Sequence, residues 1–512
     1  MAKKSAVAEK AAPPKGRRYV GPRETVGFVL YDVAQSVNVS NRNQEFTDRI
    51  LNISRFVQAA VTPFATAWDI INDLFVAAMV DKTRTRFGKF RPYLVLYPLY
   101  GIPVSMLFYV LPYLFLNQQD DPRFLLKIIV WALVTMFNEL TGTISGIART
   151  GMIANITPDP QDRLGLINKA NFFSMFGEDL PKQVFAILQD IIANNKSLSL
   201  TSINTKMRKL YLYFGVGTIA IAGALSLYFA FISKERVFGT EQGDEKPPTI
   251  RESMRGLRNN RPLFMLMISE ILGGFSIKGQ LGTYTDSILN FRNFGLLTGI
   301  PGSPVSYLSY AYVPWLRERF STKTIWLVSS HFTAPTSILI FFFGMIHSKK
   351  DNKRLFLKLA PMMVVYMIEN TFHMALYGAS KVIPEEIRNE CIDYGEWKNG
   401  FRAEGMTGAL RSMPSKITNA VGNSLTSVIL GAIGFKTGKE YNKQNERTAM
   451  GVFALATIIP TVTSILGIIP KFFYNISQDD REQMYAELKS RRAAVAQQMA
   501  RATDEAAESA AQ

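Results

Sequence analysis

Two carboxylates stand four residues apart in an apolar segment, and they are the residues of this sequence best suited to do chemistry. Asp69 and Asp73 lie within residues 57–80, and on a helix this spacing stacks both side chains on one face. The segment can cross a bilayer, which takes roughly 20 apolar residues. Each ionisable group inside it costs about 2.5–3.5 kcal/mol on insertion scales, so we expect both to face a cavity and serve a function. The alternative is a short soluble helix with a solvated acidic face.

The segments that must position this pair are apolar blocks separated by short charged connectors. This alternation, in a chain of 512 residues that is 47% hydrophobic, is typical of a polytopic helical membrane protein. We expect an all-α fold with twelve transmembrane helices, at residues 25–39, 57–80, 93–116, 124–156, 170–193, 211–232, 263–289, 296–316, 325–346, 355–382, 405–435 and 449–473. The stretch 299–304, rich in glycine and proline, should break the start of the eighth helix.

The longest internal polar stretch divides these blocks into two sets of six. We expect an N-terminal tail (1–23), a six-helix bundle (24–232), a middle loop (233–262), a second six-helix bundle (263–473) and a C-terminal tail (474–512). Lysine and arginine are roughly twice as frequent on one side of this arrangement, which predicts that both termini are cytoplasmic. Many secondary transporters consist of two such halves around a central site. We expect a multi-pass protein of the cell (inner) membrane.

Composition excludes several classes of function. Cys391 is the only cysteine, so the chain forms no intrachain disulfide and no cysteine metal cluster, and no histidine pair has metal-ligand spacing. The net charge of +17 could indicate nucleic acid. The basic residues stand at the ends of apolar blocks, however, which predicts contacts with anionic lipid and no nucleic-acid partner. Residues 1–23 lack the apolar core of a signal peptide. The chain has no phosphate loop, nucleophile elbow or metal motif, so we predict neither an enzyme nor a cofactor.

Two long motifs carry a resemblance to a known family. The first runs from Trp68 to Asp73 and resumes from Asp81 to Pro92; the second runs from Asp393 to Gly405. Together they resemble the glycoside–pentoside–hexuronide:cation symporters, the melibiose-permease-like branch of the major facilitator superfamily. The resemblance covers residues 21–473. It implies the major facilitator fold, with two six-helix bundles, and cation-coupled transport of a small solute by a protein that functions as a monomer.

The resemblance also implies a cation site. In this family paired aspartates bind the coupling cation, sodium or in some members a proton, and they match Asp69 and Asp73. Asn72 is a neighbour of the second aspartate, and a threonine of the family's cation site falls on Thr143. Two carboxylates with a hydroxyl or amide supply the hard oxygens that sodium prefers. A proton would use the same carboxylates, with the pKa of one raised by burial and by its like-charged neighbour.

The substrate residues of the family are not reproduced. Its sugar-binding members carry acids where this chain has Ala34 and Gly146, a tryptophan at Thr150 and an arginine at Asn171. The candidate substrate residues are therefore Asp32, Arg149, Asn171, Lys416, His373 and Tyr377.

Arg149 and Lys416, which falls on a helix-eleven lysine of the family, would suit an anionic solute such as a hexuronide. Alternatively, Arg149 snorkels to the inner surface or pairs with Glu139 or Glu178. Glu369 and His373, spaced i, i+4, form either a proton relay or a structural hydrogen bond.

We interpret the basic loop 82–91 as a structural latch of the inner gate. We expect its arginines to bridge helix ends and acids such as Asp81, Glu396 or Glu404, closing the inner side in one state. The gating and structural candidates are Arg84, Arg86, Lys89, Arg91, Asp393, Glu396 and Arg402. In the tail, Met484, Leu488, Val495 and Met499 share one helical face. That tail lies either on the inner leaflet or free in solvent as a helix.

We therefore predict a secondary active transporter that couples sodium or a proton to symport of a sugar, glycoside or hexuronide-like solute by alternating access. Its partners are the solute, the coupling cation and the lipid bilayer. Two alternatives are a lysolipid or amphiphile transporter of the same fold, and a non-transporting membrane sensor.

Overall fold

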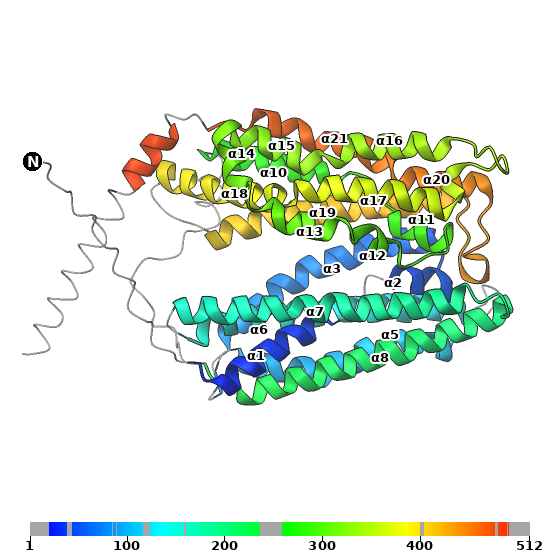
Figure 1. Ribbon diagram of the computed structural model, residues 1–512. Helices are drawn as coiled ribbons and strands as arrows, with labels where there is room; N and C mark the ends of the chain where they lie inside the picture. Colours follow the sequence, from blue (N-terminus) through cyan, green and yellow to red (C-terminus); the bar gives the residue numbers. More distant parts are fainter. Residues whose placement is uncertain are drawn as a thin grey trace, which may run out of the picture. The chain divides into compact units, whose positions relative to one another are not determined.

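The structure is a computed structural model of a helical protein (Figure 1), which describes residues 20–37, 43–83, 85, 87–88, 90–115, 123–157, 160–235, 259–399, 404–476, 480–488 and 490. Extended pairing in these residues consists of two isolated bridges, Thr85 with Gly88 and His347 with Arg354. The chain forms two compact units, Met1–Ile53 with Ala67–Gly243, and Ser54–Thr66 with Asp244–Gln512. Residues 54–66 thus belong to the second unit, although we expected them in the first bundle.

The helices of the N-terminal half are mostly long and continuous. They are α1 (Pro22–Ser36), α2 (Asn43–Glu45), η2 (Phe46–Ile50), α3 (Arg55–Lys82), α4 (Arg91–Leu96), η3 (Tyr97–Gly101), α5 (Ile102–Leu114), α6 (Phe124–Asn155), α7 (Pro160–Ala193) and α8 (Leu200–Ile232). In this unit α1 packs between α7 and α8, and α4 packs on α6 and α8. Pro98, which has no amide hydrogen, lies in the π-helical turn η3 that joins α4 to α5.

The helices of the C-terminal half are interrupted more often than we predicted. They are α10 (Arg261–Gly274), α11 (Leu281–Ser287), α12 (Phe294–Gly299), α13 (Gly302–Ser309), α14 (Val313–Arg319), α15 (Thr322–His331), α16 (Thr333–Met345), η4 (Leu355–Leu357), α17 (Leu359–Ala375), α18 (Tyr377–Asn399), α19 (Glu404–Ala432), η5 (Gly438–Glu440), α20 (Glu446–Ala456), α21 (Ile458–Ile468) and η6 (Ile469–Phe473). The break at 299–304 is confirmed. The seventh helix, expected to be continuous, stops at Gly274 and resumes at Leu281.

That break in the seventh helix is stabilised by neighbouring helices. The backbone amide of Ile277 donates to Thr463 Oγ1 at 3.1 Å, and that of Lys278 donates to Thr426 Oγ1 at 2.8 Å. The amide of Gln280 donates to the carbonyl of Leu455 at 3.0 Å. Irregular backbone at membrane depth is tolerated where such partners exist. A sequence pattern does not reveal them, because they come from segments more than 140 residues away.

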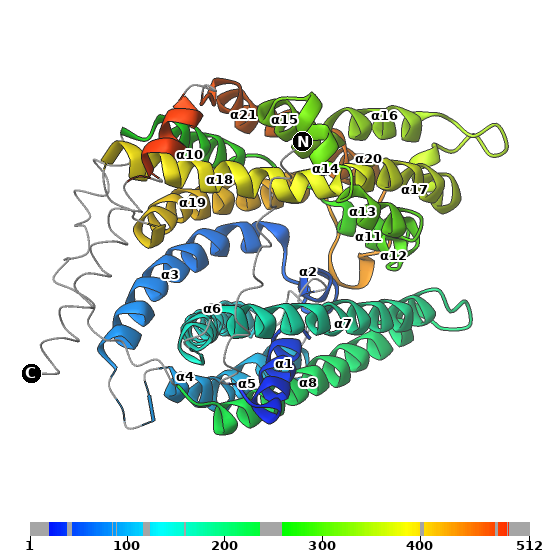
Figure 2. The ribbon, with the colours of Figure 1, turned by 60° about the vertical axis from the view of Figure 1, so that its left-hand side comes forward.

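The start of the tail takes neither of the two positions that we predicted. Residues 480–488 form a helix against the end of α18, as Figure 2 shows in red beside yellow. Met484 and Leu488 are buried against Trp397 and Tyr394. Trp397 Nε1 also donates to Glu487 Oε2 at 2.9 Å. This part of the apolar face is therefore covered by the protein itself, whereas Val495 and Met499 lie outside the described residues.

Polar contacts hold the start of the same tail helix. Arg481 Nη2 donates to Glu390 Oε2 at 3.0 Å and its Nε bonds the other carboxylate oxygen, while the Tyr474 hydroxyl donates to Oε2 at 2.9 Å. The hydrogen bond to Glu390 raises the pKa of the Arg481 guanidinium. Glu390, which lies on α18, is itself only 5% exposed.

Among the described residues, five helices are long and apolar enough to cross a membrane: Arg91–Leu114, Phe124–Ile153, Leu200–Ile232, Thr322–Met345 and Glu446–Phe473. Other long helices, such as α3 and α7, contain more polar residues. The count of twelve transmembrane helices stays a prediction.

Candidate functional site

The paired carboxylates lie on α3, where the helical repeat places Asp69, Asn72 and Asp73 on one face. Thr143 of α6 donates its hydroxyl to Asp73 Oδ1 at 2.9 Å. One residue before Asp69, Trp68 Nε1 donates to the Met136 carbonyl of α6 at 2.9 Å. These contacts bring the four expected cation residues together across two helices, although they lie about 70 residues apart in the sequence.

Asn72 is the most informative member of this cluster. Its side chain is 2% exposed, and neither its amide nitrogen nor its amide oxygen has a hydrogen-bond partner. A buried polar group without a partner costs about 1–3 kcal/mol. Asp69 and Asp73 are half-buried. Two carboxylates, a threonine hydroxyl and an amide oxygen form a donor set that fits a hard cation such as sodium.

A second charged cluster joins α1, α6 and α7. Arg149 of α6 forms an ion pair with Asp32 of α1, and Ser174 of α7 donates to the other Asp32 oxygen at 3.0 Å. The Asp32 side chain is 5% exposed and the Arg149 side chain 34%. Arg149 therefore pairs with an acid that neither alternative named, because α1 brings the carboxylate of Asp32 to the guanidinium. The side chain of Glu178 lies outside the described residues.

A neutral network holds these helices next to the ion pair. Ser145 donates to Gln35 Oε1 at 3.1 Å, and Gln35 Nε2 donates to Ser226 Oγ at 3.1 Å. On α6, Gly146 faces open space, since a Cβ atom built there would have no neighbour within 4 Å. Arg149 lies three residues further along α6. The glycine that replaces an acid of the family thus leaves room beside the guanidinium.

The other candidate substrate residues lie on α7, α17, α18 and α19. Asn171 lies in α7, and its side chain is outside the described part. In the second unit Lys416 is half-buried on α19 and His373 half-buried on α17. The Tyr377 ring lies edge-on to Tyr310, with centroids 6.2 Å apart, and beneath the ammonium of Lys381.

The expected pairing of Glu369 with His373 is wrong. No hydrogen bond or ion pair joins these two side chains among the described residues. Glu369 Oε1 instead accepts from Thr336 Oγ1 of α16 at 3.4 Å. Helical spacing brought the two residues near each other, but packing against α16 supplied a different partner.

The basic loop is anchored to the end of α8. Arg91 donates to the carbonyls of Ala230 and Phe231 at 2.8 and 2.7 Å. The amides of Phe90 and Arg91 both donate to Glu235 Oε1, at 2.8 and 2.9 Å. The bridge from Arg91 to a helix end was predicted, whereas Glu235 was missed. Its signal in the sequence was its position just after the sixth apolar block.

The backbone conformation and surroundings of residue 88 require glycine at this position of the loop. Its φ is +109°, and a Cβ atom there would lie 2.4 Å from the Glu235 carboxyl carbon. Among the other gating candidates, Asp393 and Glu396 are half-buried on α18. Arg84, Arg86, Lys89 and Arg402 lie outside the described residues.

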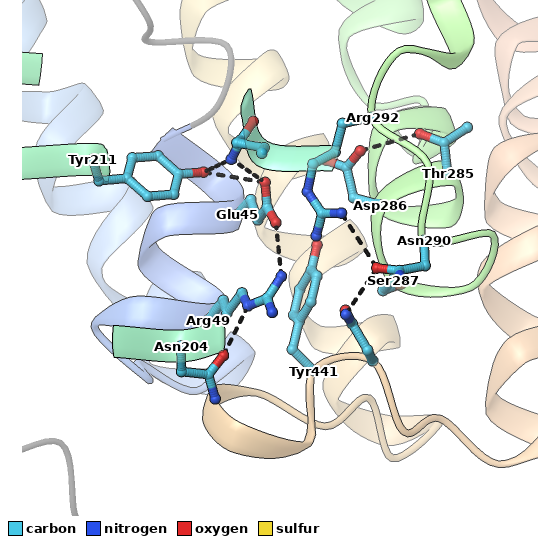
Figure 3. Close-up of polar contacts among 12 residues, drawn as sticks. Glu45, Arg49, Asn204, Tyr211, Thr285, Asp286, Ser287, Asn290, Arg292 and Tyr441 are labelled. Atoms are coloured by element: carbon cyan, nitrogen blue, oxygen red, sulfur yellow. Dashed lines mark hydrogen bonds and ion pairs between the residues drawn. The ribbon is translucent and has the colours of Figure 1, made fainter. Parts of the chain in front are cut away.

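Each unit also has a polar cluster that the sequence did not reveal (Figure 3). In the first unit Glu45 pairs with Arg49 at 3.4 Å and accepts from Gln189 and Tyr211 at 2.9 and 3.1 Å, while Arg49 donates to Asn204 at 3.1 Å. In the second unit Asn290 Oδ1 accepts from Arg292 at 3.2 Å and from Asn442 at 2.9 Å. Residues 43–50, which lie between the first two helices expected from the sequence, form α2 and η2 and are largely buried.

Comparison with known proteins agrees with these features. Residues 29–478 match the family model described as MFS/sugar transport protein. The chain is 23% identical to the glucuronide carrier protein homolog of Escherichia coli (strain K12), over 92% of this chain and 96% of that protein. It is 25% identical to the isoprimeverose transporter of Lactiplantibacillus pentosus, over 92% of each. The fold is similar to the crystal structure of a D-xylose-proton symporter, with a TM-score of 0.53 and 13% identity, over 88% of this chain and 95% of that one.

Proposed function

Because this chain belongs to the MFS/sugar transport protein family, we propose that it is a cation-coupled symporter whose solute is a sugar derivative carrying an acid group. The chain is a membrane transporter and not an enzyme, and its relatives include a glucuronide carrier protein homolog and an isoprimeverose transporter. The coupling cation, the acid group of the solute and a location in the inner membrane, with cytoplasmic termini, are our proposal.

One observation carries this proposal: α6 contributes a residue to each of the two charged clusters. Its Thr143 bonds Asp73 of the candidate cation site, and its Arg149 bonds Asp32. Six residues of α-helix separate them by about 9 Å along the axis. A change in α6 produced by cation binding would therefore reach Arg149 directly. Coupling requires each ligand to strengthen the binding of the other by the same factor.

Arg149 supports an acidic solute. A guanidinium binds a carboxylate in a bidentate fork, and the space above Gly146 leaves that side of α6 open. In the described state Asp32 takes the place of such a carboxylate. Two proteins similar to this chain are named for acid sugars, the glucuronide carrier protein homolog and a putative sulfoquinovose importer of Salmonella typhimurium. We infer that the solute carboxylate competes with Asp32 for Arg149.

In the transport cycle the cation binds among Asp69, Asn72, Asp73 and Thr143. The solute then binds with its acid group on Arg149. The two ligands together lower the barrier to the change between outward-facing and inward-facing states. The same donors accept either sodium or a proton, so the experiment must distinguish them.

Purified protein in proteoliposomes tests the coupling. We expect glucuronate to accumulate against its gradient when a sodium or a proton gradient is imposed, and only one of the two should suffice. Asp73→Asn should abolish accumulation while leaving exchange of solute, and Glu440→Gln, which changes an exposed acid, should behave as wild type. Accumulation by Asp73→Asn would show that the cation site is assigned wrongly.

A second comparison tests the solute. Arg149→Gln should lower glucuronate uptake at least tenfold, and uptake of the neutral methyl glucuronate ester much less. Equal losses for the two solutes would refute recognition of the acid group by Arg149. The Asp69 and Asp73 assignments would be unaffected by that result.

A further inference from the structure

The second unit contains a polar cavity that the proposed transport site does not use. Its volume is about 800 Å³, and its walls come from α10, α15, α18, α19 and the α21–η6 segment. Ligand pockets are typically about 300–1,000 Å³. Each helix contributes residues at helical spacing, such as Pro384 and Arg388 of α18 or Ser415 and Asn419 of α19. The cavity therefore lies among the inner faces of these helices.

The charged groups of this cavity carry an excess of positive charge. Arg388 and Lys471 are its basic residues, whereas Glu270 is its acid. Serine hydroxyls and the Asn419 amide complete its polar surface. A lining of this composition favours an anion that also carries hydroxyl groups.

Lys471 is the residue of the lining that such an anion would stabilise most. Its Nζ lies 3.0 Å from His331 Nε2, at hydrogen-bond distance, and 4.7 Å from the centre of the Trp326 ring. Glu270 of the same lining attracts Lys471 electrostatically, but among the described residues no ion pair joins Lys471 to a carboxylate. An anion in the cavity would therefore give Lys471 a counter-charge in direct contact.

The walls of the cavity are rigid where α10 meets α21. Ser269 donates to the Gly467 carbonyl at 2.6 Å. A Cβ atom on Gly467 would lie 2.7 Å from the Cα of Gly273. These two helices are therefore in close backbone contact along this wall of the cavity.

We propose that this cavity binds a small hydroxylated organic anion, with Lys471 as its principal counter-ion and Arg388 as a second. This site is additional to the solute site on α6. The ligand would be a sugar acid or a sugar phosphate.

Isothermal titration of purified full-length protein with gluconate, glucose 6-phosphate and neutral glucose tests this proposal. Wild type and Lys349→Met, which removes an exposed lysine of the same unit, should bind either anion with equal affinity and glucose at least tenfold more weakly. Lys471→Met should weaken anion binding at least tenfold. Ser330→Leu, which fills the cavity without changing its charge, should do the same. Arg149→Gln should retain this binding.

Three results would overturn the proposal. The first is that wild type binds neither anion at millimolar concentration. The second is that Arg149→Gln abolishes binding while Lys471→Met and Ser330→Leu retain it, because the anion would then occupy the transport site. The third is that gluconate binds in phosphatidylcholine nanodiscs but not in phosphatidylglycerol nanodiscs, because a lipid headgroup would then be the occupant.

Discussion

Replacement of Leu488 by alanine should release the tail helix while leaving the helical bundles folded. Leu488 is 1% exposed and packs with Met484 against Trp397. Truncation of a buried leucine costs about 2–5 kcal/mol, and least where the surroundings can relax. The tail helix is an edge element, so we expect about 2–3 kcal/mol. That loss raises the open fraction of the segment about 30- to 150-fold.

The local character of this effect follows from how the segment is held. Residues 480–488 contact α18 through Met484, Glu487 and Leu488. Most helical stability in proteins comes from such packing rather than from propensity. Hydrogen exchange of the amides 480–488 and trypsin cleavage after Arg481 should both accelerate, whereas the thermal midpoint of the bundles should stay unchanged.

Tyr485 supplies the matched control, since it lies on the same helix and is 48% exposed. Tyr485→Ala should leave exchange at the wild-type rate. If Leu488→Ala also exchanges at that rate, the apolar face does not hold the tail. If the two variants accelerate equally, the effect comes from helix propensity and our reasoning about the buried face is wrong.

Three further predictions concern stability in detergent. Asp32→Asn and Arg149→Gln should each lower the free energy of unfolding by about 1.5–3 kcal/mol, because each breaks the same charge-assisted hydrogen bond. In a double-mutant cycle the double variant should lose clearly less than the sum of the two. Additive losses would mean that the pair does not interact. Asn72→Leu should raise the thermal unfolding midpoint in cation-free buffer, because it removes buried polar atoms whose missing hydrogen bonds cost about 1–3 kcal/mol. The same variant should no longer be stabilised by the coupling cation. A lower midpoint in cation-free buffer would contradict this. Gly467→Ala should lower the free energy of unfolding by about 1–3 kcal/mol, because the new methyl group is overpacked against Gly273. The control Gly282→Ala, whose methyl group would have no neighbour within 4 Å, should be neutral or stabilising by about 0.4–1 kcal/mol. Equal thermal midpoints of the two variants would refute the close contact.

Sequence periodicity alone placed several features correctly. The spacing of Asp69 and Asp73 puts both on one face wherever a helix forms, because helical geometry is local. The shared face of Met484 and Leu488 follows from the same rule. The resemblance added Thr143, which the structure bonds to Asp73. The break at 299–304 was visible because glycine and proline act on their own backbone.

Partners across the fold were decided only by tertiary structure. Arg149 had several acids within plausible reach, and the packing of α1 against α7 selected Asp32, 117 residues away. Likewise, an amphipathic pattern shows that a helix has an apolar face, but not whether lipid, solvent or protein contacts that face. Here Trp397 packs against it. The cavity around Lys471 needed five helices to define it. Helical geometry is encoded by neighbours in sequence, whereas counter-charges and cavities depend on which helices pack together.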